Sequence, residues 1–259
     1  MNLKIENKTA LVTGSTKGIG FAIARLLAAE GAKVIINGRT EVSARAAAAK
    51  IGDRARSVAA DVSSATGCTA LVEQVANVDI LVNNAGIFEP KPFADIPDGD
   101  WERFYQVNVM SGVRLTRAYL PAMLERNWGR IVFISSESGI QIPEEMIHYG
   151  MTKAAELALV NGIARLTKGT GVTVNAVLPG PTASEGVAEF VGQLASKAEQ
   201  TPAEFEREFF RNVRPTSLLQ RFATADEVAA MVAYTCSSLA SATNGAALRV
   251  DGGVARGTI

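Results

Sequence analysis

TALVTGSTKGIGFAIARLLAAEGA, residues 9–32, joins a short apolar run to a helical pattern through a turn with three glycines. The run at 9–13 is typical of a buried strand, and residues 19–30 form an apolar helical stripe that stops at Gly31. Small residues in such a turn let the backbone approach a pyrophosphate, which then sits at the positive end of the helix. The stretch predicts a dinucleotide-binding unit, with an ordinary tight turn as the alternative. The three glycines are Gly14, Gly18 and Gly20.

The rest of the chain repeats the alternation of apolar runs and helical patterns. Continuous apolarity without clean alternation suits strands covered on both faces, and repeated strand–helix units indicate a doubly wound parallel sheet. We expect a single α/β domain over residues 1–259. The further runs occupy residues 33–37, 55–60, 79–83, 129–135, 172–178 and 246–250. The further helical patterns occupy residues 41–50, 64–76, 100–126, 148–168 and 225–238.

Composition limits the kind of protein this can be. The chain has 259 residues, 47% of them hydrophobic, and a formal net charge of zero, so a large core can form and no nucleic-acid partner is indicated. One histidine and two cysteines argue against a metal site, and we expect Cys68 and Cys236 to be free buried thiols. No apolar run reaches the roughly 18 residues of a membrane span, and no signal peptide is evident. We expect a cytoplasmic protein.

The end of the second apolar run indicates which dinucleotide binds. It closes with Gly38 and Arg39, without the carboxylate that takes the ribose hydroxyls in NAD-binding units. A glycine leaves room for a 2′-phosphate and an arginine can bind it bidentately, while Lys17 adds a second cation. We therefore expect NADP(H) rather than NAD(H), although each cation could be a solvated surface residue. Asp61 is a candidate acceptor for the adenine amino group, and residues 83–86 would lie beside the cofactor.

Short motifs follow one another in a characteristic order. They are TGSTKGIG (13–20), Asp61 with Val62, NNAG (83–86), Asn108, ISS (134–136), YGMTK (149–153), Asn175, PG (179–180) and DGG (251–253). Through these motifs the chain resembles the classical short-chain dehydrogenases/reductases over essentially its whole length. The resemblance implies a Rossmann-like sheet of seven strands with helices on both faces, a nicotinamide cofactor and hydride transfer between a carbonyl and an alcohol. It also implies a homotetramer or homodimer formed through the helices at 100–126 and 148–168.

The resemblance, together with the glycine turn and Arg39, defines the expected cofactor contacts. A hydroxyl near the nicotinamide carboxamide is expected after the PG turn, and either Thr182 or Ser184 could supply it. The full set is Gly14, Ser15, Thr16, Lys17, Gly18, Ile19, Gly20, Gly38, Arg39, Asp61, Val62, Asn84, Ala85, Gly86, Tyr149, Lys153, Pro179, Gly180, Thr182 and Ser184.

The family's catalytic tetrad falls, by the same resemblance, on Asn108, Ser136, Tyr149 and Lys153. The serine stands 13 residues before the tyrosine, which selects Ser136 over its neighbour Ser135. Ser138 is a secondary candidate that could face the substrate. Asn108 would hold a water that connects the lysine to solvent.

Helical spacing puts Tyr149 and Lys153 on one face, one turn apart. A nearby ammonium, with the positive charge of an oxidised nicotinamide, should lower the tyrosine pKa and suit it to general acid/base catalysis. In reduction, Tyr149 would protonate the developing alkoxide and Ser136 would hydrogen-bond the same oxygen. Lys153 would also bind the ribose hydroxyls of the nicotinamide half.

Residues around this motif carry open questions. His148 is expected to be an exposed residue at the helix start, because adjacent helical residues point about 100° apart. Glu137, Glu144 and Glu145 would either disfavour anionic substrates or form the acidic first turn of the helix that starts near Ile147.

Residues 184–214 interrupt the alternation and are expected to form a substrate lid with helices at 187–197 and 202–212. Four phenylalanines of this segment could cover an apolar substrate or bury the lid's own helices, and the second reading is preferred. They are Phe190, Phe205, Phe209 and Phe210.

Three functions agree with these observations. The first is an NADP(H)-dependent carbonyl reductase or alcohol dehydrogenase acting on a small molecule. The second is a 3-oxoacyl-(acyl-carrier-protein) reductase, which would need a cationic docking surface that the neutral chain does not clearly offer. The third is a non-catalytic NADP(H)-sensing regulator, which we disfavour because all four tetrad positions are filled.

Overall fold

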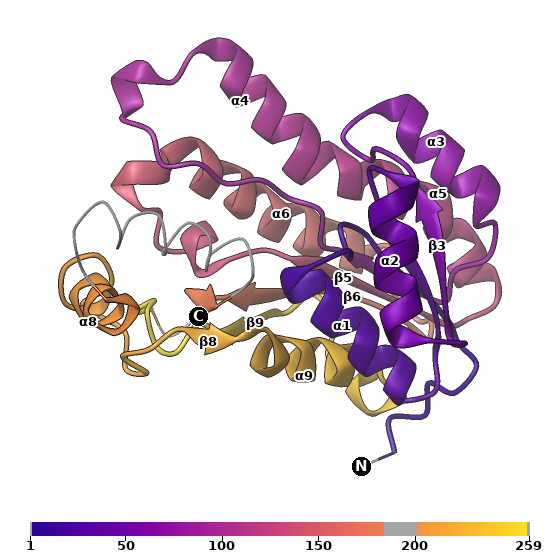
Figure 1. Ribbon diagram of the computed structural model, residues 1–259. Coiled ribbons are helices and arrows are strands. Elements are labelled where there is room, and N and C mark those ends of the chain that lie inside the picture. Colours follow the sequence, from indigo (N-terminus) through magenta and orange to yellow (C-terminus); the bar gives the residue numbers. More distant parts are fainter. Residues whose placement is uncertain (1, 184–200, 258–259) are drawn as a thin grey trace.

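The computed structural model describes residues 2–183 and 201–257. Seven strands form one parallel sheet in the order β3-β2-β1-β4-β5-β6-β9 (Figure 1). Each strand coincides with one of the apolar runs, which confirms the predicted sheet. The strands are β1 (Thr9–Val12), β2 (Lys33–Gly38), β3 (Ala55–Ala59), β4 (Ile80–Asn83), β5 (Gly129–Ile134), β6 (Val172–Pro179) and β9 (Ala247–Val250).

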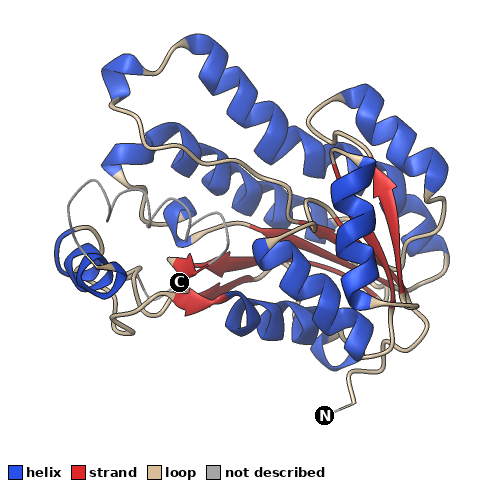
Figure 2. Ribbon diagram, in the orientation of Figure 1, coloured by secondary structure: helices blue, strands red, loops and turns tan. Residues whose placement is uncertain are grey.

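Helices cover both faces of the sheet (Figure 2). On one face lie α1 (Gly18–Ala29), α2 (Glu41–Ile51) and α9 (Ala225–Cys236), and on the other lie α3 (Ala65–Gln74), α5 (Ser111–Glu125) and α6 (Ile147–Arg165). Successive strand residues point to opposite faces. In β1, Val12 therefore packs in the core under α1, whereas Leu11 packs in the core under α5. Because both faces are covered, the apolar runs are continuous.

The helix expected over residues 100–126 is in fact divided. It consists of α4 (Asp98–Phe104), a π-helical segment η2 (Tyr105–Met110) and α5. The periodicity of the sequence does not reveal this, since the three segments follow one another without a cap or a breaking residue between them. Short π-helical segments frequently occur at functional sites, and η2 contains Asn108.

The segment after β6 contains two elements that the sequence reasoning did not find. β7 (Thr182–Ala183) pairs in parallel with β8 (Ala223–Thr224). The expected helix at 202–212 is α8 (Pro202–Asn212), which Thr201 and Glu204 cap reciprocally. The expected helix at 187–197, Ser184 and Phe190 lie outside the described residues.

The aromatic side chains of α8 pack mainly on one another. Phe209 lies 6.4 Å from Phe205, 5.2 Å from Phe210 and 5.1 Å from Phe222, measured between ring centroids. Phe210 is buried. For these residues the preferred interpretation, a core of the segment itself, agrees with the structure.

The remaining sequence expectations concern thiols and membranes. Cys68 and Cys236 are both free and buried, as predicted. Among the described residues, no helix combines the length and the apolarity needed to cross a bilayer.

Candidate active site

The predicted site residues gather at the carboxyl edge of the sheet. The glycine turn, Arg39, Asn84 and Ser136 follow the ends of β1, β2, β4 and β5. β1 has β2 on one side and β4 on the other, so the strand order reverses there. Ligands of open parallel sheets bind outside the carboxyl ends at such a reversal.

The glycine turn has the geometry of an anion cradle. Gly14 and Gly18 have φ angles of 59° and 60°, in the left-handed region that favours glycine. A Cβ at Gly20 would lie 2.4 Å from Asn84 Nδ2, which leaves no room for a side chain. α1 begins at Gly18, and Lys17 before it supplies no side-chain cap, so this residue leaves the first N–H groups of the helix available to an anion. The turn therefore fits the pyrophosphate of a dinucleotide.

The NNAG segment after β4 fixes this turn. Asn84 Nδ2 donates hydrogen bonds to the carbonyl oxygens of Thr13 and Gly14, at 2.9 and 3.1 Å. The Thr13 hydroxyl oxygen accepts from the N–H groups of Asn84 and Ala85, at 2.9 and 3.0 Å. Thr13 stood inside a quoted motif but was not chosen as a site residue; a hydroxyl at the end of the strand before the first glycine is the signal.

The side chain of Ser15 forms hydrogen bonds with two strands of the sheet. It is fully buried, its Oγ donates to the Val12 carbonyl at 2.6 Å, and the N–H of Asn37 donates to the same Oγ at 3.0 Å. The side chain thus links the glycine turn to β2. A cofactor contact from Ser15 stays a prediction.

The end of β2 offers positive charge. Arg39 and Lys17 are exposed, and within residues 2–183 and 201–257 neither forms an ion pair. Gly38 is buried, and a Cβ there would lie 2.4 Å from Thr16 Cγ2. The side chain of Thr16 therefore occupies part of the space beside Gly38 that we expected a phosphate to use. Two unpaired cations at the mouth of the cradle fit a phosphorylated ribose.

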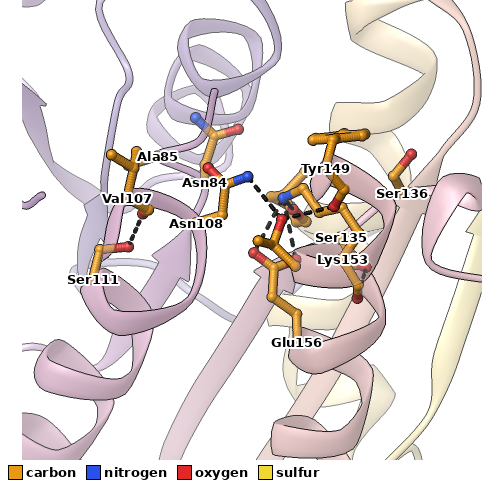
Figure 3. A network of polar contacts seen from close by, with 12 residues as sticks. Asn84, Ala85, Val107, Asn108, Ser111, Ser135, Ser136, Tyr149, Lys153 and Glu156 are labelled. Atoms are coloured by element: carbon orange, nitrogen blue, oxygen red, sulfur yellow. Dashed lines mark hydrogen bonds and ion pairs between the residues drawn. The ribbon is translucent and has the colours of Figure 1, made fainter. Parts of the chain in front are cut away.

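Tyr149 and Lys153 lie one turn apart near the start of α6, as predicted (Figure 3). Lys153 Nζ is 5.7 Å from the centroid of the Tyr149 ring and donates a hydrogen bond of 2.8 Å to the carbonyl oxygen of Ile134. A Cβ at Gly86 would lie 3.6 Å from this Nζ, so the NNAG segment passes directly beside the lysine. The ring of Phe88 packs edge-on against Tyr149 at 6.3 Å.

A further carboxyl group belongs to this network. Lys153 Nζ lies 3.1 and 3.2 Å from the two carboxylate oxygens of Glu156, and both side chains are buried. Burial raises the pKa of Glu156 to about 7, although the lysine beside it acts in the opposite direction. Glu156 was not among the residues predicted from the sequence; the available signal was an acid three residues after the lysine, on the same face of α6.

The pKa of Tyr149 does not follow the sequence expectation. Burial raises it above its ordinary value of 10, and the carboxylate of Glu137 raises it further. The nearby Ser136 hydroxyl and Arg214 lower it, with less effect. The lowering expected from Lys153 together with an oxidised nicotinamide is therefore not present in the protein by itself, since desolvation disfavours the phenolate and Glu156 balances the lysine charge.

Ser136 has a buried acidic partner. Its Oγ donates a hydrogen bond of 2.5 Å to Oε2 of Glu137 and accepts one of 3.1 Å from the N–H of Ser138. Burial raises the pKa of Glu137, while the hydrogen bond from Ser136 lowers it. The neighbouring Ser135 donates to the carbonyl oxygen of Lys153 at 2.9 Å, so it supports α6 instead. This division is consistent with the choice of Ser136 over Ser135.

The three acidic residues do not form the first turn of α6, which begins at Ile147. Glu137 follows β5 in a short 3-10 helix, η3 (Glu137–Gly139), and is largely buried; the first-turn interpretation is wrong for it. Glu144 and Glu145 lie in a separate 3-10 helix, η4 (Glu144–Met146), just before α6. Arg214 lies 3.5 Å from Glu137 and 3.0 Å from Glu145 and so bridges the two segments.

The side-chain amide of Asn108 forms hydrogen bonds with other residues of the protein. Nδ2 donates to the carbonyl oxygen of Ile87 at 3.0 Å and to the Thr152 hydroxyl at 2.9 Å, and Oδ1 accepts from the Ile87 N–H at 2.8 Å. These bonds tie the segment after β4 to α6. Asn108 thereby helps to set the position of Lys153 relative to the glycine turn.

His148 is not exposed, contrary to the sequence expectation. It is fully buried, with its ring 4.1 Å from Phe104 and 5.9 Å from Trp101. Burial lowers its pKa, and among the described residues neither ring nitrogen has a hydrogen-bond partner. α4 packs over the start of α6 and covers the residue, which the sequence could not show.

The sequence model of the short chain dehydrogenase family matches residues 8–195. The chain belongs to the short-chain dehydrogenase/reductase family. The uncharacterized oxidoreductase YvaG of Bacillus subtilis (strain 168) is 48% identical over 261 residues, and the match covers 99% of each chain. The 3-oxoacyl-[acyl-carrier-protein] reductase FabG of Aquifex aeolicus (strain VF5) is 35% identical over 263 residues, covering 98% of this chain and 100% of that protein.

A solved structure supports the same assignment. L-sorbose reductase from Gluconobacter frateurii, crystallised with NADPH and L-sorbose, superposes with a TM-score of 0.94 at 29% identity, covering 99% of this chain and 100% of that one. These comparisons establish an oxidoreductase of the short-chain dehydrogenase/reductase type.

The remaining expected cofactor residues of this short-chain dehydrogenase/reductase lie at the same edge. Asp61 is exposed after β3 and accepts from the N–H of Ser63 at 3.1 Å. Thr182 Oγ1 donates to the carbonyl oxygen of Gly180 at 2.8 Å, which closes the turn after β6. A Cβ at Gly180 would lie 2.7 Å from Asp251 Cα, so this turn packs on the end of β9.

Proposed function

We propose that the protein is an NADP(H)-dependent oxidoreductase that interconverts a carbonyl compound and a secondary alcohol, with Tyr149 as general acid/base. The nicotinamide, when bound, supplies or accepts the hydride. The observation that carries the proposal is the placement of Tyr149 and Lys153 on one face of α6, with Ser136 and the NNAG segment beside them.

The glycine turn and the cations after β2 would bind the cofactor. The free N–H groups at the start of α1 suit the pyrophosphate, and Arg39 with Lys17 suits a 2′-phosphate. The NADPH bound by L-sorbose reductase supports NADP(H) for this chain. Asp61, Val62, Pro179, Gly180 and Thr182 would line the remainder of the cofactor site.

Tyr149 would donate its proton to the carbonyl oxygen during reduction, and in oxidation its phenolate would take a proton from the alcohol. Ser136 would give its hydrogen bond to the same oxygen in exchange for its present acceptor, Glu137. Lys153 would stabilise the phenolate and bind the ribose hydroxyls. A positive nicotinamide beside Tyr149 would oppose the effect of burial on the tyrosine pKa.

The 3-oxoacyl-(acyl-carrier-protein) reductase remains a second candidate because of the relationship to FabG. A non-catalytic sensor is disfavoured, since Tyr149, Lys153, Ser136 and Asn108 come together at one edge of the sheet. The proposed setting is the cytoplasm, with one domain over residues 1–259 and a homotetramer or homodimer formed through α4, α5 and α6.

A substrate panel separates these candidates. NADPH oxidation is followed with simple ketones, hydroxyketones, diketones and acetoacetyl thioesters, with NADH in parallel. The proposal expects turnover of at least one small carbonyl compound with NADPH preferred. Exclusive turnover of the thioesters selects the acyl-carrier-protein reductase, and tight NADPH binding without any turnover selects the sensor.

A further inference from the structure

Glu156 is a buried carboxyl group for which the reaction outlined above has no role. It extends from α6 toward the end of β5 and is only 2% exposed. Its two oxygens lie 3.1 and 3.2 Å from Lys153 Nζ, and Lys153 is the first of the groups that lower its pKa. Removing a carboxylate from water is costly even when it is paired, and an apolar residue of similar volume often serves stability as well. The contact with Lys153, rather than stability, therefore accounts for a glutamate at this position.

We propose that Glu156 is a positioning residue of the active site, which orients the Lys153 ammonium and sets the net charge beside Tyr149. This inference rests on the proposed function, because it assumes that Tyr149 transfers the proton.

The orientation follows from the hydrogen bonds of the ammonium group. An ammonium has three donors. One is directed to the carbonyl oxygen of Ile134 at 2.8 Å, and Glu156 takes one or two of the others. These partners hold Nζ at a fixed place 5.7 Å from the Tyr149 ring and beside Gly86.

The charge follows from the groups that face the tyrosine. Glu137 comes from the segment after β5, Arg214 from the segment after α8, and Lys153 and Glu156 from α6 itself. Glu137 and Arg214 form one ion pair, and Lys153 and Glu156 form another. The negative charge of Glu156 thus compensates the positive charge of Lys153, and Glu156 is one of the groups that raise the pKa of Tyr149.

The compensation depends on pH. Lys153 is the only charged group that acts on Glu156 among the described residues, and burial places the Glu156 pKa at about 7. Above neutral pH the two side chains are together neutral. Below it Glu156 binds a proton, and the lysine charge acts on Tyr149 without compensation.

The test replaces the carboxylate and follows alcohol oxidation, in which the phenolate form of Tyr149 is required. Glu156→Gln keeps an acceptor for Lys153 but removes the charge, so the acid limb of the kcat/KM profile should move to lower pH by about one unit. Glu156→Met, which fills a similar volume, should move the limb in the same direction. Glu156→Asp keeps the charge and should leave it near the wild-type position. Glu73→Gln, at an exposed acid on α3, is the matched control and should leave it unchanged.

A second readout needs neither cofactor nor turnover. A carboxyl group whose pKa is raised by folding contributes less stability as pH rises through the interval between its unfolded and folded values. The urea midpoint of the wild type minus that of Glu156→Gln should therefore decrease as the pH rises from about 4.5 to 7. Above about pH 8 this difference should stay constant.

The outcomes are separable. An unmoved acid limb and parallel urea midpoints in Glu156→Gln, with Tyr149→Phe inactive, would overturn this inference and leave the proposed function intact. An active Tyr149→Phe would overturn the proposed function itself. If the Gln variant does not fold, the Met variant decides in the same way: a limb displaced to lower pH supports the proposal, and an unmoved limb contradicts it.

Discussion

Arg214 Nε lies 3.5 Å from Oε1 of Glu137, and the side chains are 11% and 7% exposed. Arg214 comes from the segment that follows α8, whereas Glu137 accepts the hydrogen bond of Ser136. The pair therefore joins the region after β6 to Ser136, the serine proposed to bind the substrate oxygen. A substitution of either partner should change both the free energy of unfolding and the position of Ser136.

Arg214→Ala should lower the free energy of unfolding by about 3 kcal/mol, because it leaves Glu137 buried without its cation. Urea unfolding measures the loss. Arg211→Ala, at an exposed arginine in the last turn of α8, is the control and should stay within about 0.5 kcal/mol of the wild type. Equal stabilities of the two variants would show that the ion pair does not stabilise the fold.

Arg39→Ala should weaken NADPH binding by roughly tenfold to a hundredfold, the value of a charge-assisted hydrogen bond, and leave NADH binding nearly unchanged. Fluorescence titration with each coenzyme measures both constants. Lys33→Ala, at an exposed cation at the opposite end of β2, is the control. A similar loss for both coenzymes would mean that Arg39 does not contact the 2′-phosphate. Exchanging Gly38 for Asp is a less direct test, since the new side chain must displace Thr16.

Gly20→Ala should abolish tight cofactor binding and cost about 1–3 kcal/mol, because its Cβ would lie 2.4 Å from Asn84 Nδ2 and 2.6 Å from the Gly14 carbonyl oxygen. Gly99→Ala in α4 is the matched control, since nothing lies within 4 Å of a Cβ there. Thermal unfolding and NADPH titration of both variants decide. If Gly20→Ala bound NADPH as the wild type does, the turn would not be the pyrophosphate cradle.

His148→Phe should make stability less sensitive to acid. Burial lowers the His148 pKa, so the unfolded chain binds its proton first, and stability falls as pH drops below the unfolded value of about 6.5. The residue contributes at most about 1.4 kcal/mol per pH unit in that window. Glu156 acts with the opposite sign in an overlapping range, so the informative quantity is the variant minus wild-type difference at pH 7 and pH 5.5. An identical difference at both values would contradict the assignment.

The sheet could be predicted from sequence because its signals are local. The run at 9–13, the glycine turn and the stripe at 19–30 lie together in one stretch, and all seven strands were found in this way. The break of residues 100–126 into α4, η2 and α5 was missed, since no cap and no breaking residue marks the points where one segment gives way to the next.

The site could be predicted where its residues carry a motif, and not where they act through packing. Tyr149 and Lys153 were found through the motif by which the chain resembles the family. Glu156 lies three residues from Lys153 on α6, but its burial and the bond from Lys153 to the end of β5 exist only once α6 is placed against the sheet. The burial of His148 depends on α4 crossing over it, and the link from Arg214 to Glu137 spans distant parts of the chain. Contacts of this kind follow from tertiary structure alone.

The most direct test of the account is turnover by Tyr149→Phe on whichever carbonyl substrate the panel identifies. The phenyl ring keeps the contact with Phe88 and leaves the glycine turn untouched, so the variant should fold and bind NADPH as the wild type does. We predict that kcat falls by at least about a hundredfold, the low end for loss of a general acid/base. Near-normal kcat in a variant that binds NADPH normally would contradict the assignment of Tyr149 as the proton donor.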